Sequence, residues 1–189
     1  MAGIQRPERL AQSWFARPAP TVARELIGCA LVHGERSAMI VETEAYLGPQ
    51  DRASHARFGP TARTSVMFGP AGRSYVYLCY GIHEMFNIVT GEDGHGEAVL
   101  IRAIAPLAGF GERADDLTIG RGPGKVTRAL GLDRSHDRRD LARGELYVTA
   151  HASPPRLGCG PRVGVAYAGS WARRQLRFWW RDHPAVTTP

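Results

Sequence analysis

Lysine is almost absent from this chain of 189 residues: Lys125 is the only one, and the other side chains counted as basic are arginines. The formal net charge is +6. The planar guanidinium of arginine contacts phosphate at two points, so an arginine-rich basic surface favours nucleic acid or another polyanion as a partner. Genomic base composition can produce the same bias, and charge alone does not separate the two interpretations.

Cysteine is also scarce. The three cysteines lie far apart and form no Cys-x-x-Cys motif, which argues against a disulfide framework and against a structural zinc site. No apolar run suggests a membrane span, and residues 1–19 contain arginines and prolines but no apolar core of a secretory signal. The sequence therefore predicts a cytoplasmic protein that is not associated with a membrane.

Several common catalytic motifs are missing as well. The stretch Gly120-Arg-Gly-Pro-Gly-Lys125 resembles a phosphate loop, but Ile119 stands where a Walker A motif has its first glycine and Val126 where it has serine or threonine. His-x-Glu occurs without the Pro-Cys-x-x-Cys of a zinc deaminase, and no Gly-x-Ser-x-Gly occurs. What remains is a helix start at which Lys125 and backbone N–H groups can contact a phosphate.

The most informative segment that is present is Met39–Leu47, which has the pattern of a strand. Because side chains alternate along a strand, Glu42, Glu44 and Tyr46 share one face. A carboxylate seldom lies on a largely buried strand unless it is paired, ligates a metal or takes part in acid–base chemistry. The sequence therefore predicts that this strand forms part of an active site.

Periodicity and turn residues predict a single mixed α+β domain over residues 1–189, with residues 1–19 as a loosely ordered arm. The expected strands are 29–33, 37–47, 74–80, 85–90, 97–105, 145–150, 162–167 and 175–180. The expected helices are 22–27, 122–130 and 138–143, and a long loop over 48–72 contains a helical turn near 51–55. Loops of this length are usually functional.

A hairpin over residues 74–90 places Tyr80 next to its turn glycine. In the simpler interpretation, which is favoured without other evidence, Tyr80 folds back on the core. In the other, it is a wedge that enters DNA between base steps, as in proteins that distort DNA or extrude a base. Tyr46, His55 and Tyr77 are candidate aromatic walls for an extruded base.

Two polar residues on neighbouring predicted strands also have two interpretations each. Asn87 contacts either the edge of a base or a nearby backbone group. Arg102 is a lone charge within an apolar strand, so it needs a partner. Glu42 and Glu44 are the candidates, and the same contact would position a catalytic carboxylate.

Taken together, these residues resemble the alkyladenine (3-methylpurine) DNA glycosylase family over nearly the whole chain from Ala23. The matching stretches are Val41–Tyr46, His55, Tyr75–Gly81, Asn87, Arg102-Ala103, Gly122–Lys125 and Arg162–Val165. The sequence departs from the family pattern at Ile82, where a methionine is expected, and at His83, where some members have tyrosine. The resemblance implies a curved, largely antiparallel sheet with flanking helices and a protruding β-hairpin that inserts into DNA.

The resemblance also implies the chemistry. Members remove alkylated and deaminated purines from duplex DNA by hydrolysing the N-glycosidic bond, which leaves an abasic site. By resemblance, Glu44 activates water with the help of Arg102, Tyr80 intercalates, and Asn87 excludes guanine. Tyr46, His55 and Tyr77 would enclose the flipped base. We expect a monofunctional monomer that needs no metal, cofactor or obligate protein partner and binds duplex DNA containing damaged purines, with Lys125 at the DNA backbone.

Two other functions are compatible with these residues. A metal-dependent nuclease could use Glu42, Glu44 and Asp51 as carboxylate ligands. A non-catalytic protein could bind the minor groove and bend DNA.

Overall fold

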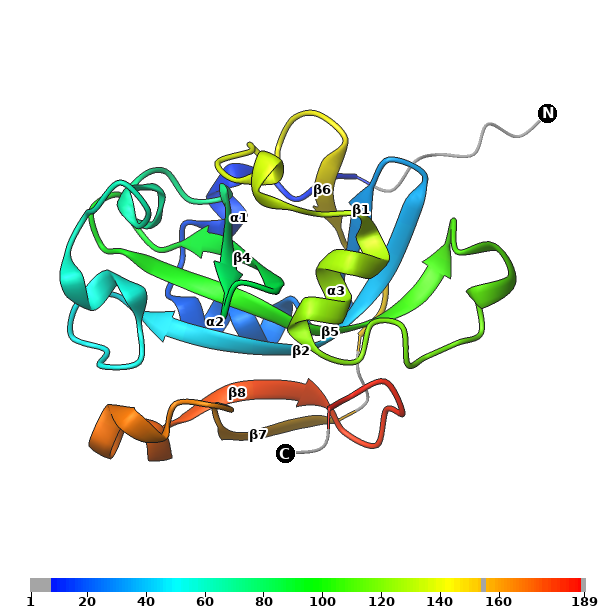
Figure 1. Ribbon diagram of the computed structural model, residues 1–189. Coiled ribbons are helices and arrows are strands. Elements are labelled where there is room, and N and C mark those ends of the chain that lie inside the picture. Colours follow the sequence, from blue (N-terminus) through cyan, green and yellow to red (C-terminus); the bar gives the residue numbers. More distant parts are fainter. Residues whose placement is uncertain (1–7, 154–155, 188–189) are drawn as a thin grey trace.

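The strands form one antiparallel sheet that curls around the core (Figure 1). The computed structural model describes residues 8–153 and 156–187. The strands are β1 (Ala30–His33), β2 (Arg36–Leu47), β3 (Ser74–Cys79), β4 (His83–Thr90), β5 (Glu97–Ala108), β6 (Leu146–Thr149), β7 (Leu157–Pro161) and β8 (Gln175–Trp180). Their order is β3-β4-β5-β2-β1-β6, while β8 pairs with β2 and β7 with β8. The predicted α+β class and curved antiparallel sheet are confirmed.

The register of the strands separates a core face from a face that carries polar side chains. Residues directly opposite each other in an antiparallel pair project to the same face. The core face holds Ala45, Val76, Phe86, Ile88, Val99 and Ile101, which cluster with Val22, Ala23 and Leu26. On the opposite face, Glu44 lies across from Leu100, Leu100 from Asn87, and Asn87 from Tyr75. Side chains far apart in the sequence therefore gather on one surface.

The helices are few and short. They are α1 (Gln12–Phe15), α2 (Ala19–Glu25) and α3 (Pro123–Leu130), together with the 3-10 helices η1 (His55–Phe58), η2 (Ser65–Phe68), η3 (Gly111–Arg113), η4 (Arg134–His136) and η5 (Ala166–Arg173). Helix α3 begins with proline and ends at the left-handed Gly131, as predicted. A Cβ atom on Gly124 would lie 2.9 Å from a ring nitrogen of His83, so glycine allows α3 to approach the β3–β4 hairpin closely.

Three local predictions are wrong, two of them because of long-range contacts. Residues 138–143 form turns instead of a helix, since the backbone of Arg138 and Arg139 is hydrogen-bonded to Ser74. Residues 162–167 form no strand, because β7 ends at Pro161 and the side chain of Arg162 turns inward to Asp51. The helical turn expected near 51–55 begins later, at His55.

The predicted N-terminal arm is partly integrated into the fold. Residues 1–7 lie outside the described residues, whereas residues 12–15 form α1 and Phe15 is buried in the main core. The backbone N–H of Ala19 donates a hydrogen bond to Glu97 on β5 over 2.7 Å. Residues 12–19 therefore do not form a loosely ordered arm. Among the described residues, no helix is both long and apolar enough to cross a membrane.

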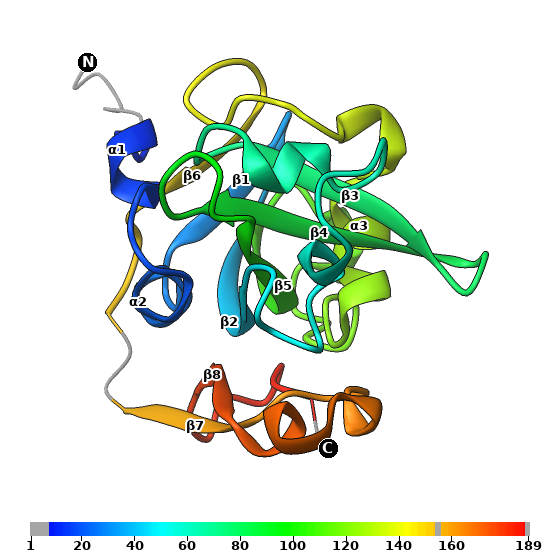
Figure 2. The same ribbon diagram turned by 90° about the vertical axis from the view of Figure 1, so that its left-hand side faces the viewer.

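The β3–β4 hairpin projects from the body of the protein (Figure 2). At its tip, Tyr80 is 93% exposed and Ile82 70% exposed. Tyr80 has a φ of +50° and Gly81 a φ of +73°, which are backbone angles of the tight turns that join twisted strands. The simpler interpretation, in which Tyr80 folds back on the core, is wrong, because this turn directs the ring into solvent.

Candidate active site

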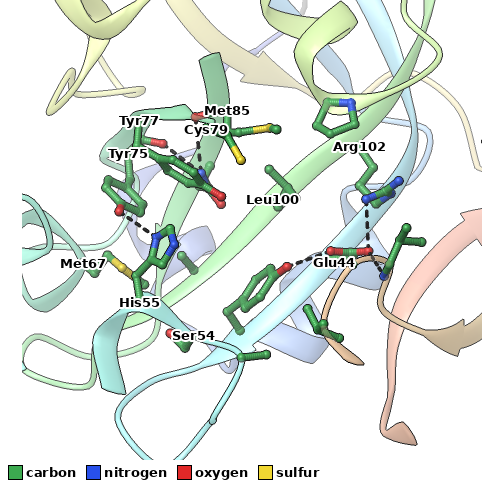
Figure 3. Close-up of a pocket in the computed structure, with 18 of the residues that line it drawn as sticks. Glu44, Ser54, His55, Met67, Tyr75, Tyr77, Cys79, Met85, Leu100 and Arg102 are labelled. Carbon is green, nitrogen blue, oxygen red and sulfur yellow. Dashed lines mark hydrogen bonds and ion pairs between the residues drawn. The ribbon is translucent and has the colours of Figure 1, made fainter. Parts of the chain in front are cut away.

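A pocket of about 490 Å³ lies on the polar face of the sheet. Strands β2, β3, β4 and β5 each contribute side chains to its lining, and the loop after β2 and the segment after β7 close it. Of the predicted site residues, the pocket is lined by Glu44, Tyr46, His55, Tyr77, Tyr80, Asn87 and Arg102. Figure 3 shows a cluster of aromatic residues at one end and the Glu44–Arg102 pair at the other.

Glu44 is fully buried from solvent, and its carboxylate accepts hydrogen bonds from neighbouring groups. Its Oε1 atom accepts a hydrogen bond from the backbone N–H of Val163 over 2.8 Å, and its Oε2 atom accepts one from the Tyr46 hydroxyl over 2.8 Å. Burial raises the pKa of Glu44, while Arg102 and the Val163 amide oppose the rise. A carboxyl whose pKa is raised toward neutral pH is suited to accept a proton during a reaction.

Arg102 joins the carboxylates of Glu42 and Glu44. Its Nε donates to Glu42 Oε1 over 2.9 Å, and its Nη1 lies 3.4 Å from Glu44 Oε1. The two interpretations of Arg102 therefore describe one arrangement, since a structural ion pair with Glu42 also directs the guanidinium at Glu44. Arg177 on β8 donates to the same Glu42 oxygen over 2.7 Å, a partner that the sequence did not reveal.

The other end of the pocket is aromatic. The rings of His55 and Tyr77 meet edge to face with centroids 4.6 Å apart, and His55 Nδ1 lies 3.0 Å from the Tyr75 hydroxyl. Burial, together with Arg63 and Arg57, lowers the pKa of His55 from 6.5 to about 4. The imidazole is therefore neutral near pH 7, and flat uncharged rings of this kind can stack on a base.

Asn87 contacts the backbone and also faces the pocket. Its Nδ2 donates to the carbonyl oxygen of Tyr75 over 3.0 Å, which is the local role considered from the sequence. Because the amide nitrogen is held by that bond, the side-chain orientation is fixed. Asn87 is 4% exposed and lines the pocket between the aromatic rings and Leu100.

A buried ion pair that the sequence did not predict fixes the segment after β7. Both terminal nitrogens of Arg162 donate to the Asp51 carboxylate, and one also donates to the carbonyl oxygen of Ala45 over 2.9 Å. This anchor places the N–H of the next residue, Val163, on Glu44. The stretch Arg162–Val165 matched the family, but its role depends on a contact with the distant loop after β2.

The carboxylates proposed as nuclease ligands are already occupied. Asp51 is bound by Arg162 and by the backbone N–H groups of Leu47 and Ala53, while Glu42 is bound by two arginines. In the part of the chain that the structure describes, no three His, Cys, Asp or Glu side chains gather as metal ligands. A cation would have to displace arginines, so the geometry does not favour the nuclease.

Lys125 does not line the pocket that contains Glu44. It is exposed on α3, where its amine donates to the carbonyl oxygen of Thr118 over 3.2 Å. Pro123, the first residue of α3, lines the Glu44 pocket, and Lys125 lies two residues after it. This position is compatible with a contact to DNA outside the pocket, and that contact remains a prediction.

Comparison with known proteins assigns the family. The family model described as methylpurine-DNA glycosylase matches residues 13–184. A relative from Anaeromyxobacter dehalogenans (strain 2CP-1) is 51% identical, with 96% of this chain and 86% of the relative covered. One from Myxococcus xanthus is 49% identical (94% and 93% covered), and one from Legionella pneumophila (strain Paris) is 41% identical (95% and 98% covered). All three carry the name "Putative 3-methyladenine DNA glycosylase". The match favours a glycosylase over the nuclease and the non-catalytic DNA binder, and this chain belongs to the methylpurine-DNA glycosylase family of DNA-repair hydrolases.

Proposed function

We propose that this protein flips alkylated or deaminated purines out of duplex DNA and hydrolyses their N-glycosidic bond with water activated by Glu44. The observation that carries the proposal is the burial of Glu44 at one end of a pocket whose other end is aromatic. The pocket would take the extruded base, and the carboxylate would lie at the sugar. Such a pocket is needed because the bond is inaccessible while the base is stacked in the duplex.

The hydrogen bonds of Glu44 leave acceptor sites on its carboxylate for a water molecule. An ionised carboxylate accepts up to about four hydrogen bonds, and Tyr46 occupies one site on Oε2. In the proposed reaction, the water oxygen attacks C1′ and gives a proton to Glu44, while the glycosidic electron pair leaves with the purine. The ionised carboxylate also stabilises the positive charge that develops on the sugar.

The aromatic end suits the proposed substrates. His55 is neutral near pH 7, so it does not repel a base that alkylation has made cationic. Burial keeps the pKa of Tyr77 above its usual range, so its hydroxyl stays protonated. Asn87, held by the Tyr75 carbonyl, would crowd the exocyclic amine of undamaged guanine. Alkylated purines leave readily because they already carry charge, whereas neutral hypoxanthine would depend more on the pocket.

The proposal is tested with duplexes that each carry one defined lesion, such as 3-methyladenine or hypoxanthine, in buffer containing EDTA. We expect release of the free base and an abasic site that alkali then cleaves, with no strand break before alkali is added. Borohydride is expected to trap no protein–DNA adduct, because hydrolysis by water forms no Schiff base. Direct phosphodiester cleavage, or dependence on a divalent cation, would contradict the proposal.

We further expect Tyr80→Ala to weaken capture of a lesion by about 10–100-fold, because stacking on an aromatic ring contributes about 1–3 kcal/mol per base. Tyr80 is 93% exposed and lines the rim of the pocket, so the change should not lower thermal stability. The measurement is the dissociation constant for a lesion-containing duplex by fluorescence anisotropy. Tyr147→Ala on β6, at the opposite end of the strand order from β3, is the control. Equal affinities for wild type and Tyr80→Ala would refute the wedge.

A further inference from the structure

The segment over residues 183–187 follows β8 and turns back along the protein (Figure 1). Ala185 is fully buried in a cluster with Val41, Ala103 and Ala105. The Nε atom of Arg121 donates to the carbonyl oxygen of Val186 over 2.9 Å. These contacts hold the segment in place without any participation of Thr187. The family match ends at residue 184, so Thr187 lies beyond it.

Thr187 is hydrogen-bonded to the carboxylate of Glu42. Its backbone N–H donates to Oε2 over 2.8 Å, and its hydroxyl lies 2.8 Å from both carboxylate oxygens. Its carbonyl oxygen accepts a hydrogen bond from Arg177 Nη2 over 2.9 Å. Thr187 therefore binds both Glu42 and Arg177, an acidic and a basic residue that are themselves paired.

The network is a buried row of alternating charge. Glu44, Arg102, Glu42 and Arg177 follow one another, and each is at most 9% exposed. Buried charges are tolerated when each is paired and hydrogen-bonded. Two arginines and the two donors of Thr187 supply Glu42 with about the four hydrogen bonds that a carboxylate accepts. Glu42 therefore has no site left for the Nη1 of Arg102, which stays beside Glu44.

We infer that Thr187 is a positioning residue: by completing the hydrogen bonds of Glu42, it keeps the outer nitrogen of Arg102 directed at Glu44. The inference rests on the proposed role of Glu44 as the base. Without the Thr187 hydroxyl, Arg102 turns toward the vacant site on Glu42 and away from Glu44. The ionised form of Glu44 then loses part of its stabilisation, so the acid limb of the activity profile moves to higher pH.

The other groups that face Glu44 do not contact Thr187. They are Tyr46 on the same strand, Tyr77 on β3, and Arg162 after β7. Within the described contacts, Glu42 and Arg177 are the side chains that Thr187 binds. If substitution of Thr187 moves the acid limb of the pH profile, the effect would therefore act on Glu44 through Glu42 and Arg102.

The test is the pH profile of single-turnover base release from a 3-methyladenine duplex with enzyme in excess. This lesion carries its own charge, so the acid limb reports on the protein and not on protonation of the leaving group. We expect Thr187→Val to move the limb upward by a fraction of a pH unit, whereas Thr187→Ser, which keeps the hydroxyl, restores the wild-type profile. Glu42→Gln is expected to move it downward by about one unit, because it removes a negative charge near Glu44.

Failure of this inference can be told apart from failure of the proposed function. Shifts of the acid limb in opposite directions for Thr187→Val and Glu42→Gln would support the inference. A limb that Thr187→Val leaves in place, or a loss of rate that is equal at every pH and shared by Thr187→Ser, would overturn it while leaving the proposed function intact. If wild type shows no acid limb, the base role of Glu44 fails and the inference fails with it.

Discussion

Glu44→Gln is expected to lower the rate of base release by about two to four orders of magnitude, the usual contribution of a positioned general base. Glutamine retains the shape of the side chain but cannot accept a proton from water at neutral pH. Lesion binding should persist, because the aromatic end of the pocket is unchanged. The measurement is single-turnover base release together with a binding isotherm on the same lesion-containing duplex.

The same variant should not be less stable than wild type at pH 7.5. Burial raises the pKa of Glu44 in the folded protein, so this group stabilises the fold most when it is protonated. That contribution is present below the ordinary pKa of glutamate and is lost as pH rises through the raised pKa. A neutral glutamine avoids the cost of a buried charge, as is common when a catalytic residue is removed.

Glu92→Gln is the control, since Glu92 is exposed in the β4–β5 turn and outside the pocket. It should keep wild-type base release. If Glu44→Gln also released the base at the wild-type rate, another group would have to activate the water. If it lost binding and release together, Glu44 would be a structural residue of the pocket.

Arg162→Met is expected to have the largest effect on stability, a loss of about 3–5 kcal/mol, because it leaves the buried Asp51 carboxylate without its cationic partner. Both side chains of this pair have zero relative exposure. For a chain of this size, the melting temperature should fall by about 6–20 °C. The measurement is urea unfolding followed by circular dichroism, with thermal melts in parallel.

Base release should decrease in the same variant even at temperatures at which it remains folded. Arg162 anchors the segment whose next residue, Val163, donates to Glu44. Arg113→Met is the matched control, because the side chain of Arg113 is 66% exposed in its ion pair with Asp116 and such pairs contribute about 0–1 kcal/mol. Equal stability losses in the two variants would contradict the structural role of the buried pair.

The sequence predicted the elements whose signals are local. The alternation of apolar and polar residues over 39–47 fixed β2 and placed Glu42, Glu44 and Tyr46 on one face, since the period of a strand is independent of its neighbours. Proline and glycine at the ends of α3 fixed that helix in the same way. The family motifs then identified most of the residues that line the pocket.

Two of the wrong local predictions share one physical cause. Residues 138–143 have the composition of a short helix, but their backbone is hydrogen-bonded to Ser74. Residues 162–167 alternate as a strand does, but the ion pair with Asp51 turns Arg162 inward. In both cases contacts with residues distant in sequence outweigh local propensity, which amounts to only a fraction of a kcal/mol per residue.

The sequence alone thus determined the family and the fold class and supplied the residues that we propose carry the chemistry, because these depend on residue types and short spacings. The tertiary structure decided that Tyr80 points into solvent, that Val163 donates to Glu44, and that Glu42 is a partner of two arginines and Thr187. The exposure of Tyr80 depends on the geometry of the β3–β4 turn. The contacts of Val163 and Thr187 depend on the packing of segments more than a hundred residues apart, such as Glu42 and Thr187, which differ by 145 positions. Local periodicity contains no information about contacts over such separations.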